Sequence, residues 1–154
     1  MSESPNESAV PAARVICVSG GTSGIGAALV EAFLAAGDRV YTCGRSPRRV
    51  AQLVDQQGAA VAAGALSVLT GDVTDALFLD SLAGRIRADT GRLDVLVNNA
   101  GVIRGGGYLE ESVADWRVTL ETNLIAPFAL TQVCASLLRS SQAPVVINIS
   151  SACA

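Results

Sequence analysis

The sequence VICVSGGTSGIG, at residues 15–26, decides the fold of this chain. An apolar run rich in β-branched residues stops at Ser19, and a turn that contains four glycines follows it. Residues 27–36 then have a helical composition, and Gly37 closes that helix. The first turn of a helix leaves backbone N–H groups unpaired, and glycines let a ligand approach those groups closely. The order of strand, glycine turn and helix therefore predicts a site for an anion such as a phosphate.

The glycine spacing by itself leaves two interpretations open. It is Gly-x-x-x-Gly-x-Gly, whereas the common dinucleotide fingerprint is Gly-x-Gly-x-x-Gly. Taken alone, such a turn also fits a tightly packed connection in any α/β domain. The motifs further along the chain favour a bound dinucleotide.

Composition limits the classes of function. The chain has 154 residues, of which 50% are hydrophobic and 16% charged, so it can form one domain with a substantial core. A net charge of −3 without blocks of like charge gives no indication of a nucleic acid or a membrane surface as partner. The sequence contains no His and no Lys, which excludes Ser-His-Asp catalysis within this chain and the commonest transition-metal ligand, so no metal site is predicted.

The N-terminal segment and the cysteines predict the cellular compartment of the protein. Residues 1–13 are polar, lack the pattern of a signal peptide and are predicted to form a flexible tail before a domain at 14–154. The four cysteines form no Cys-x-x-Cys pair, and Cys17 and Cys134 lie in apolar runs typical of a core. We expect a reduced, cytoplasmic protein.

Strands and helices alternate along the whole domain. After the first strand, β-rich runs occupy residues 39–43, 65–69, 93–97 and 144–149. Helical patterns lie at 27–36 and 48–57, after a cap at Thr74 or Asp75, and from 112 to about 140 with a bend near Pro127. Because parallel strands are joined by right-handed crossovers, this order predicts an α/β fold, a Rossmann-type doubly wound parallel sheet of order 3-2-1-4-5. Ligands are expected over the carboxyl ends of its strands.

Five motifs in register resemble the short-chain dehydrogenase/reductase family. They are residues 19–26, Gly-Asp-Val at 71–73, Asn-Asn-Ala-Gly at 98–101, Glu-Thr-Asn-Leu at 121–124 and Asn-Ile-Ser-Ser at 148–151. The resemblance is greatest to the classical type represented by 3-oxoacyl-acyl-carrier-protein reductases, which are ketoreductases. It covers residues 14–154 but only the first part of a usual member, so the sheet is expected to be truncated after strand five and the domain incomplete at its C-terminus.

The resemblance implies a cofactor site built from the turns after the first four strands. In it Ile25 would lie against the nicotinamide ring, Asp72 would accept a hydrogen bond from the adenine amino group, and Val73 would pack on the adenine. Without the family, the alternative is that Asp72 is an ordinary turn or cap residue and that residues 98–101 form a plain turn. The implied cofactor residues are Ser19, Gly20, Thr22, Ser23, Gly24, Ile25, Gly26, Arg45, Asp72, Val73, Asn99, Ala100 and Gly101.

The end of the second strand predicts which nucleotide is bound. An enzyme that prefers NAD usually carries an acid there, which accepts a hydrogen bond from the ribose 2′-hydroxyl. This chain has Gly44 at that place, followed by Arg45, which can pair with a 2′-phosphate. Arg48 and Arg49 follow one helical turn later and add positive charge. We therefore predict NADP(H) in preference to NAD(H); the alternative is that Arg45 is an ordinary solvated residue.

The family's reaction is hydride transfer between the nicotinamide and a carbonyl or alcohol substrate. By resemblance Ser151 would polarise the substrate oxygen, with Ser150 as the alternative, and Asn123 would support a proton relay. The Tyr-x-x-x-Lys pair that handles the proton in the family has no counterpart in this sequence. Each of Ser151 and Asn123 also has a plain structural interpretation, as a cap or as a polar helix residue.

Three interpretations fit a family member without that pair. The chain is the N-terminal portion of a split or processed oxidoreductase, and a second polypeptide supplies Tyr-x-x-x-Lys and covers the apolar strand five. Alternatively it is a truncated fragment without catalysis, or a non-catalytic NADP(H)-binding or regulatory subunit. The first is favoured because strand five is almost wholly apolar and the serine match follows it. Family members also associate through the long helix, here residues 116–138, so an oligomer is expected.

Overall fold

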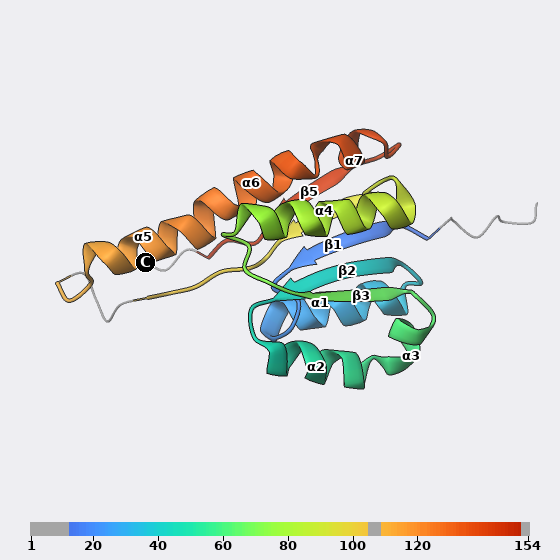
Figure 1. Cartoon of the computed structure of the whole chain (residues 1–154), viewed down its shortest axis with the longest axis horizontal. Helices are drawn as coiled ribbons and strands as arrows, with labels where there is room; N and C mark the ends of the chain where they lie inside the picture. Colours follow the sequence, from blue (N-terminus) through green and yellow to red (C-terminus); the bar gives the residue numbers. More distant parts are fainter. Residues whose placement is uncertain (1–12, 105–108, 152–154) are drawn as a thin grey trace, which may run out of the picture.

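A computed structural model describes residues 13–104 and 109–151 and arranges them as a parallel sheet between two layers of helices (Figure 1). The predicted flexible tail, residues 1–13, lies outside the described residues except for Ala13. No helix in the described ranges is long and apolar enough to cross a bilayer.

The sheet of the described chain has five parallel strands in the order β3-β2-β1-β4-β5, which confirms the predicted doubly wound topology. Their bounds lie within two residues of the predicted ones. The strands are β1 (Val15–Ser19), β2 (Arg39–Gly44), β3 (Leu66–Thr70), β4 (Val95–Asn98) and β5 (Val145–Asn148). β1 lies at the centre, where Val18 pairs with Thr42 of β2 on one side and with Val97 of β4 on the other.

The helices follow the predicted alternation with three differences. α1 begins at Gly24, three residues earlier than predicted, a short helix that was not predicted follows α2, and the long helix near the end is divided into four segments. The helices are α1 (Gly24–Ala35), α2 (Pro47–Gln56), α3 (Gly58–Ala62), α4 (Ala76–Thr90), α5 (Val113–Leu120), the π-helical segment η1 (Glu121–Ile125), α6 (Ala126–Val133) and α7 (Ala135–Arg139). Of the two predicted caps for α4, Asp75 is the one that acts, because its carboxylate accepts from the amide of Leu77 at 2.9 Å.

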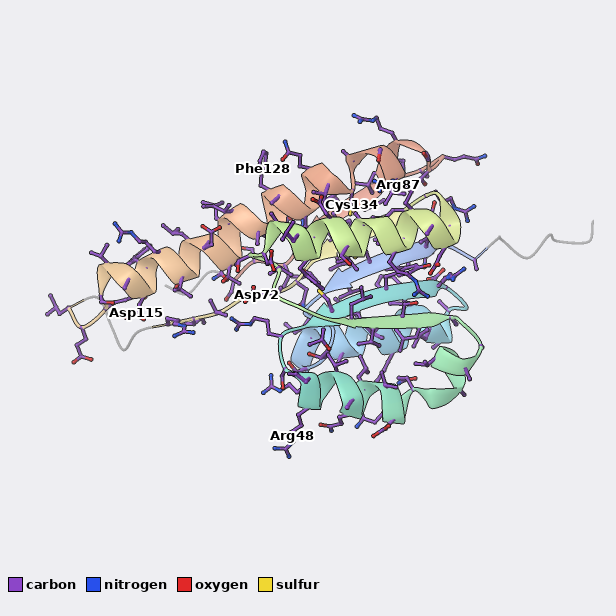
Figure 2. The ribbon with its side chains drawn as sticks, in the orientation of Figure 1. Arg48, Asp72, Arg87, Asp115, Phe128 and Cys134 are labelled. Atoms are coloured by element: carbon purple, nitrogen blue, oxygen red, sulfur yellow. The ribbon has the colours of Figure 1, made fainter. Side chains whose placement is uncertain are left out.

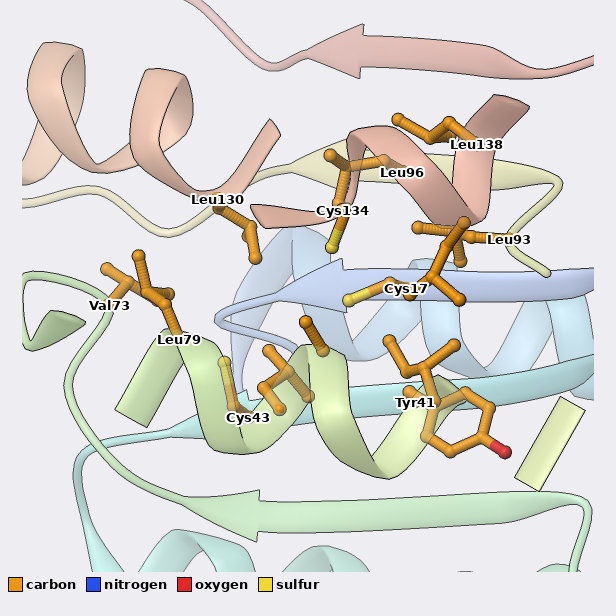
Figure 3. Close-up of a cluster of buried hydrophobic side chains, with 14 of the residues drawn as sticks. Cys17, Tyr41, Cys43, Val73, Leu79, Leu93, Leu96, Leu130, Cys134 and Leu138 are labelled. Carbon is orange, nitrogen blue, oxygen red and sulfur yellow. The ribbon is translucent and has the colours of Figure 1, made fainter. Parts of the chain in front are cut away.

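Side chains of β1 alternate between two apolar clusters, one on each face of the sheet. Val15 and Cys17 pack toward α4, α6 and α7, whereas Ile16 and Val18 pack toward α1 and α3. Figure 3 shows the first cluster, in which Cys17 and Cys134 are buried as predicted and burial raises the pKa of the Cys17 thiol well above its usual value. A strand buried on both faces explains why β1 is apolar without alternation.

Asp94 ties three strands together at their amino ends. Its Oδ2 accepts from the amide of Val15 at 2.7 Å and from Arg92 Nε at 3.1 Å, and its Oδ1 accepts from the hydroxyl of Ser141 at 2.6 Å. Ser141 lies just before β5 and Val15 begins β1, so one carboxylate links both neighbours of β4.

β5 differs from the other strands in its exposure. All four of its residues are exposed, from Val145 at 47% to Ile147 at 39%, and no other described strand pairs with its outer edge. Its sequence is nevertheless that of a covered strand, since Val145, Val146 and Ile147 are all β-branched and apolar.

Candidate functional site

A cleft of about 380 Å³ lies over the carboxyl ends of the central strands. Four turns form its walls, which follow β1, β2, β3 and β4, and Thr122 of η1 contributes from the side. Ten of the thirteen cofactor residues predicted from the sequence line this cleft: Gly20, Thr22, Ser23, Ile25, Gly26, Arg45, Val73, Asn99, Ala100 and Gly101. The structure thus brings most of these residues together, and their contacts with a nucleotide stay a prediction.

The glycine turn after β1 is packed against the turn after β4. Gly20 has φ +69°, a conformation that other residues rarely adopt, and a Cβ added there would lie 2.9 Å from Cα of Ala100. At Gly26 an added Cβ would meet the carbonyl oxygen of Gly20 and the side-chain Nδ2 of Asn99, both at 2.4 Å. Glycine is therefore required at these two positions by the close approach of two backbone segments.

Ser19 lies beneath the cleft rather than along its wall. It is buried, and its hydroxyl accepts from the amides of Asn99 and Ala100, each at 3.0 Å, while it donates to the carbonyl of Val97 at 3.4 Å. The side chain of Asn99 donates in turn to the carbonyl of Ser19 at 2.9 Å. These bonds fix the two glycine-containing turns relative to each other, which gives Ser19 a positioning role.

The first turn of α1 provides backbone donors for an anion. Ser23 is the N-cap residue, has extended backbone angles and makes no side-chain cap to the helix amides. No acidic residue occupies the first turn. Since the helix dipole adds partial positive charge there, this end of α1 can accept a phosphate without displacing a protein carboxylate. Gly24, the first residue of α1, has φ +55° and lies in open space.

Two arginines, Arg45 and Arg49, line the cleft beside that helix end. The guanidinium of Arg49 donates to the hydroxyl of Ser23 at 3.3 Å, which joins the start of α2 to the glycine turn. Arg45 instead faces Asp72, with Nη1 and Oδ2 separated by 3.6 Å. The two positive charges therefore have different neighbours, one a neutral hydroxyl and the other a carboxylate.

Asp72 is already engaged in the structure. Its Oδ1 accepts from the amide of Thr74 at 3.0 Å and from the Thr74 hydroxyl at 2.9 Å. Burial acts to raise the pKa of this carboxyl, but the donors of Thr74 and the charge of Arg45 outweigh it and lower the pKa below the usual value. Asp72 is therefore ionised at neutral pH, and it is not among the residues that line the cleft, although its neighbours Gly71 and Val73 are.

The tip of β2 has no room for a side chain. A Cβ added at Gly44 would lie 2.4 Å from Oγ1 of Thr22. Thr22 thus fills the space into which an acidic residue at position 44 would extend. The sequence shows that position 44 is not acidic, but the contact of Gly44 with Thr22 joins two turns and is not visible in local sequence.

Asn123 lies in the π-helical segment η1, and both polar atoms of its side chain are bonded. Its Oδ1 accepts from the amide of Val102 at 2.9 Å, and its Nδ2 donates to the carbonyl of Val102 at 2.8 Å. Pro127 has no amide hydrogen to donate to the Asn123 carbonyl four residues earlier, which explains why the predicted bend takes the form of a π segment. Asn123 therefore anchors the loop after β4 with its side chain and has a backbone carbonyl relieved of its usual helical partner.

The two candidate catalytic serines follow β5 and are exposed. The end of β5 is held to β4 because Nδ2 of Asn98 donates to Oδ1 of Asn148 at 2.8 Å, and the amide of Ile149 donates to the Asn98 carbonyl at 2.9 Å. Ser150 and Ser151 thus begin at the same edge of the sheet as the cleft, but neither is among the residues that line it. The choice between them stays a prediction.

Tyr41 is placed where it cannot serve the cleft. It is fully buried in the core, and its hydroxyl donates to Asp89 at 3.0 Å. Burial, together with this hydrogen bond, raises the pKa of Tyr41 to about 12. This tyrosine is a structural residue that links β2 to α4.

A family profile described as short chain dehydrogenase matches residues 14–154, nearly the whole chain. The chain belongs to the short-chain dehydrogenase family. It is 32% identical over 138 residues to dehydrogenase/reductase SDR family member 7B of Xenopus tropicalis, a match that covers 86% of this chain and 45% of that protein. It is 30% identical over 138 residues to the 3-oxoacyl-acyl-carrier-protein reductase FabG of Salmonella typhimurium, over 90% of this chain and 54% of that protein.

Solved structures also share the fold of this chain. The NADPH bound carbonyl reductase from chicken fatty liver superimposes with a TM-score of 0.80 and 27% identity, over 90% of this chain and 60% of that one. The chain spans about half the length of the curated relatives that it matches. Family membership confirms the resemblance seen in the motifs and identifies the domain as one from the NAD(P)-dependent oxidoreductases.

Proposed function

We propose that this chain binds NADP(H), in preference to NAD(H), as part of an oxidoreductase that transfers a hydride between this cofactor and a carbonyl or alcohol substrate. The observation that carries the proposal is one cleft that combines an uncapped helix end with Arg45 and Arg49. The structural similarity to an NADPH bound carbonyl reductase supports it. When bound, the cofactor would supply or accept the hydride, and the residues of this chain would bind and orient it.

The glycine turn would hold the pyrophosphate on backbone amides at the start of α1. Ile25 is 63% exposed and borders the cleft, so it offers an apolar surface for the nicotinamide ring. Val73 also borders the cleft and offers an apolar surface for the adenine. Asp72 would accept from the adenine amino group, as the family resemblance implies.

Charge and space at the end of β2 support the preference for NADP(H). A phosphate dianion on the ribose 2′-oxygen would find the guanidinium of Arg45, which can donate two parallel hydrogen bonds. The contact between Gly44 and Thr22 keeps out the acidic side chain that would read a 2′-hydroxyl. Both features favour the phosphorylated nucleotide.

The remaining catalytic groups are proposed from two places. Within this chain Ser151 would polarise the substrate oxygen, and Asn123 would hold the loop after β4 and support proton transfer. The Tyr-x-x-x-Lys pair would come from a second polypeptide that covers β5. The exposed apolar residues of β5 support such a partner, because an unpaired apolar strand edge favours association with another chain.

A non-catalytic NADP(H)-binding or regulatory subunit is the second candidate. It is favoured by the same exposed apolar strand, which would serve to bind a partner. Association of two copies through the helices from Trp116 to Leu138 is also proposed, since Trp116, Leu124 and Phe128 are exposed there. A cytoplasmic location stays a proposal.

Binding of NADPH and NADH to the wild type and to Arg45→Asp tests the nucleotide preference. A charge-assisted bond to phosphate contributes about 1.5–3 kcal/mol, so we expect Arg45→Asp to weaken NADPH binding by about 10- to 100-fold and to leave NADH nearly unchanged. Arg48→Asp is the matched control. An unchanged preference for NADPH in Arg45→Asp would overturn the proposed role of Arg45.

A reductase assay separates the catalytic from the non-catalytic candidate. The purified chain is assayed alone and together with any polypeptide that co-purifies with it, and the mass of each species is measured. Activity only in the presence of a second polypeptide supports the proposal. Activity of this chain alone would contradict an external proton donor, and binding without activity in either sample favours the regulatory subunit.

A further inference from the structure

Arg49 occupies a bridging position between two walls of the cleft. It lies in the first turn of α2, and its Nη1 reaches the hydroxyl of Ser23 at the start of α1, 3.3 Å away. Both residues line the cleft. The guanidinium therefore stands between the turn that would hold the pyrophosphate and the turn that would hold the adenosine ribose.

The charge of Arg49 is less compensated than that of Arg45. Arg45 has the ionised carboxylate of Asp72 at 3.6 Å, and Asp72 is held in place by two hydrogen bonds from Thr74. Among the described residues no carboxylate forms an ion pair with Arg49. A phosphate that approaches Arg45 is repelled by Asp72, whereas one that approaches Arg49 displaces only a weak bond to a neutral hydroxyl.

We propose that Arg49 is the main residue that distinguishes NADP(H) from NAD(H), and that Asp72 limits the contribution of Arg45. This inference rests on the proposed function, because it assigns a role within the same nucleotide site. On binding, Arg49 would exchange its hydrogen bond to Ser23 for bonds to the 2′-phosphate. Arg45 shares the phosphate but stays attracted to Asp72.

Arg48 provides a matched control on the same helix. It has the same charge and is one position away, but it is not among the residues that line the cleft, and Figure 2 shows it extending from α2 away from the sheet. A general effect of positive charge on α2 would be removed equally by substitution of either arginine. A specific contact would be removed only at position 49.

The test measures dissociation constants for NADPH and NADH by titration of the purified chain and its variants, with their ratio as the readout. Damage to the fold weakens both nucleotides and cancels in that ratio. We expect Arg49→Gln to reduce the preference for NADPH about tenfold or more, Arg45→Gln to reduce it less, and Arg48→Gln to change it less than about twofold. Equal effects of Arg49→Gln and Arg48→Gln would overturn the inference.

A double-mutant cycle tests the role given to Asp72. In an Asp72→Asn background Arg45 loses its competing carboxylate, so we expect Arg45→Gln to cost more of the NADPH preference than it does in the wild type. An unchanged cost would show that Asp72 does not limit Arg45. A wild type that binds both nucleotides equally would overturn the proposed function itself, and a clear NADPH preference that survives Arg49→Gln would overturn only this inference.

Discussion

Strands β1 and β5 have similar sequences and opposite surroundings. Both are rich in β-branched apolar residues, and both pair in parallel with β4. Every residue of β1 is buried, whereas every residue of β5 is exposed. The difference lies in what covers them: helices lie over both faces of β1, and no described strand extends the sheet beyond β5.

The same contrast separates the two halves of the proposed site. The turn after β1 is fixed by Ser19 and Asn99 and opens into a cleft, so the residues that would bind the nucleotide are assembled within this chain. The residues after β5, which include Ser151, lie outside that cleft. The proposed nucleotide binding and the proposed catalysis would therefore depend on different parts of the sheet, and the first can be measured without the second.

The largest expected effect compares one residue type in the two strands. Ile16 of β1 is fully buried, so Ile16→Ala should destabilise the fold by about 2–5 kcal/mol. Ile147 of β5 is 39% exposed, and Ile147→Ala should cost less than about 1 kcal/mol. Chemical unfolding of both variants measures the difference. Equal costs would show that β5 is covered in solution by something that the chain meets there, such as a second copy.

A smaller effect is expected at the glycines after β1. Gly20→Ala combines a positive φ with a Cβ 2.9 Å from the backbone of Ala100, and should cost about 2–4 kcal/mol. Gly24→Ala also has a positive φ but open space around its Cβ, and should cost about 1–2 kcal/mol. Thermal unfolding with circular dichroism compares the two. If Gly24→Ala is the more damaging change, the close packing of the turns does not control stability.

The smallest effect concerns Asp94, which connects β1 to the segment before β5. Burial acts to raise its pKa, but donors from Ser141, the Val15 amide and Arg92 outweigh burial and lower the pKa. The ionised carboxylate thus stabilises the fold above its unfolded pKa of about 3.9, and this contribution is lost as the pH falls through the lower folded value. Asp94→Asn should cost about 1–2 kcal/mol at neutral pH.

The pH dependence of that cost shows whether the charge of Asp94 stabilises the fold. The difference in unfolding free energy between the wild type and Asp94→Asn should narrow as the pH falls below about 4. Asp55→Asn, at an exposed position of α2, is the control and should change little at any pH. A constant difference across the whole range would show that the charge of Asp94 contributes nothing.

Sequence patterns predicted the strand order and most of the cleft because those features depend on local signals. A glycine turn after an apolar strand, and the right-handed crossover, place the carboxyl ends of β1 to β4 along one edge. The five-residue helix α3 was missed, since it is too short to show a periodic pattern. The sequence predicted only a bend near Pro127 and not the π-helical segment η1. A proline shows that one backbone N–H donor is missing, but it does not show which helical geometry results.

Contacts between side chains far apart in the sequence were not predictable. The bonds of Asn123 to Val102, of Arg49 to Ser23 and of Ser19 to Asn99 each join separate turns. Such pairs depend on how the turns meet in three dimensions, which no spacing in the sequence records. The sequence supplied the residue types for the site, and the packing of the turns determined which of them face the cleft.

The central claim is that the turn after β1 holds the diphosphate of a dinucleotide. Amide resonances of the ¹⁵N-labelled chain, followed during titration with NADPH, test it most directly. The account predicts that the largest shifts fall on the amides of residues 20–26 and 99–101, with further shifts at Arg45 and Arg49. Saturating NADPH that leaves these amides unchanged, or that shifts chiefly residues elsewhere in the sheet, would contradict it.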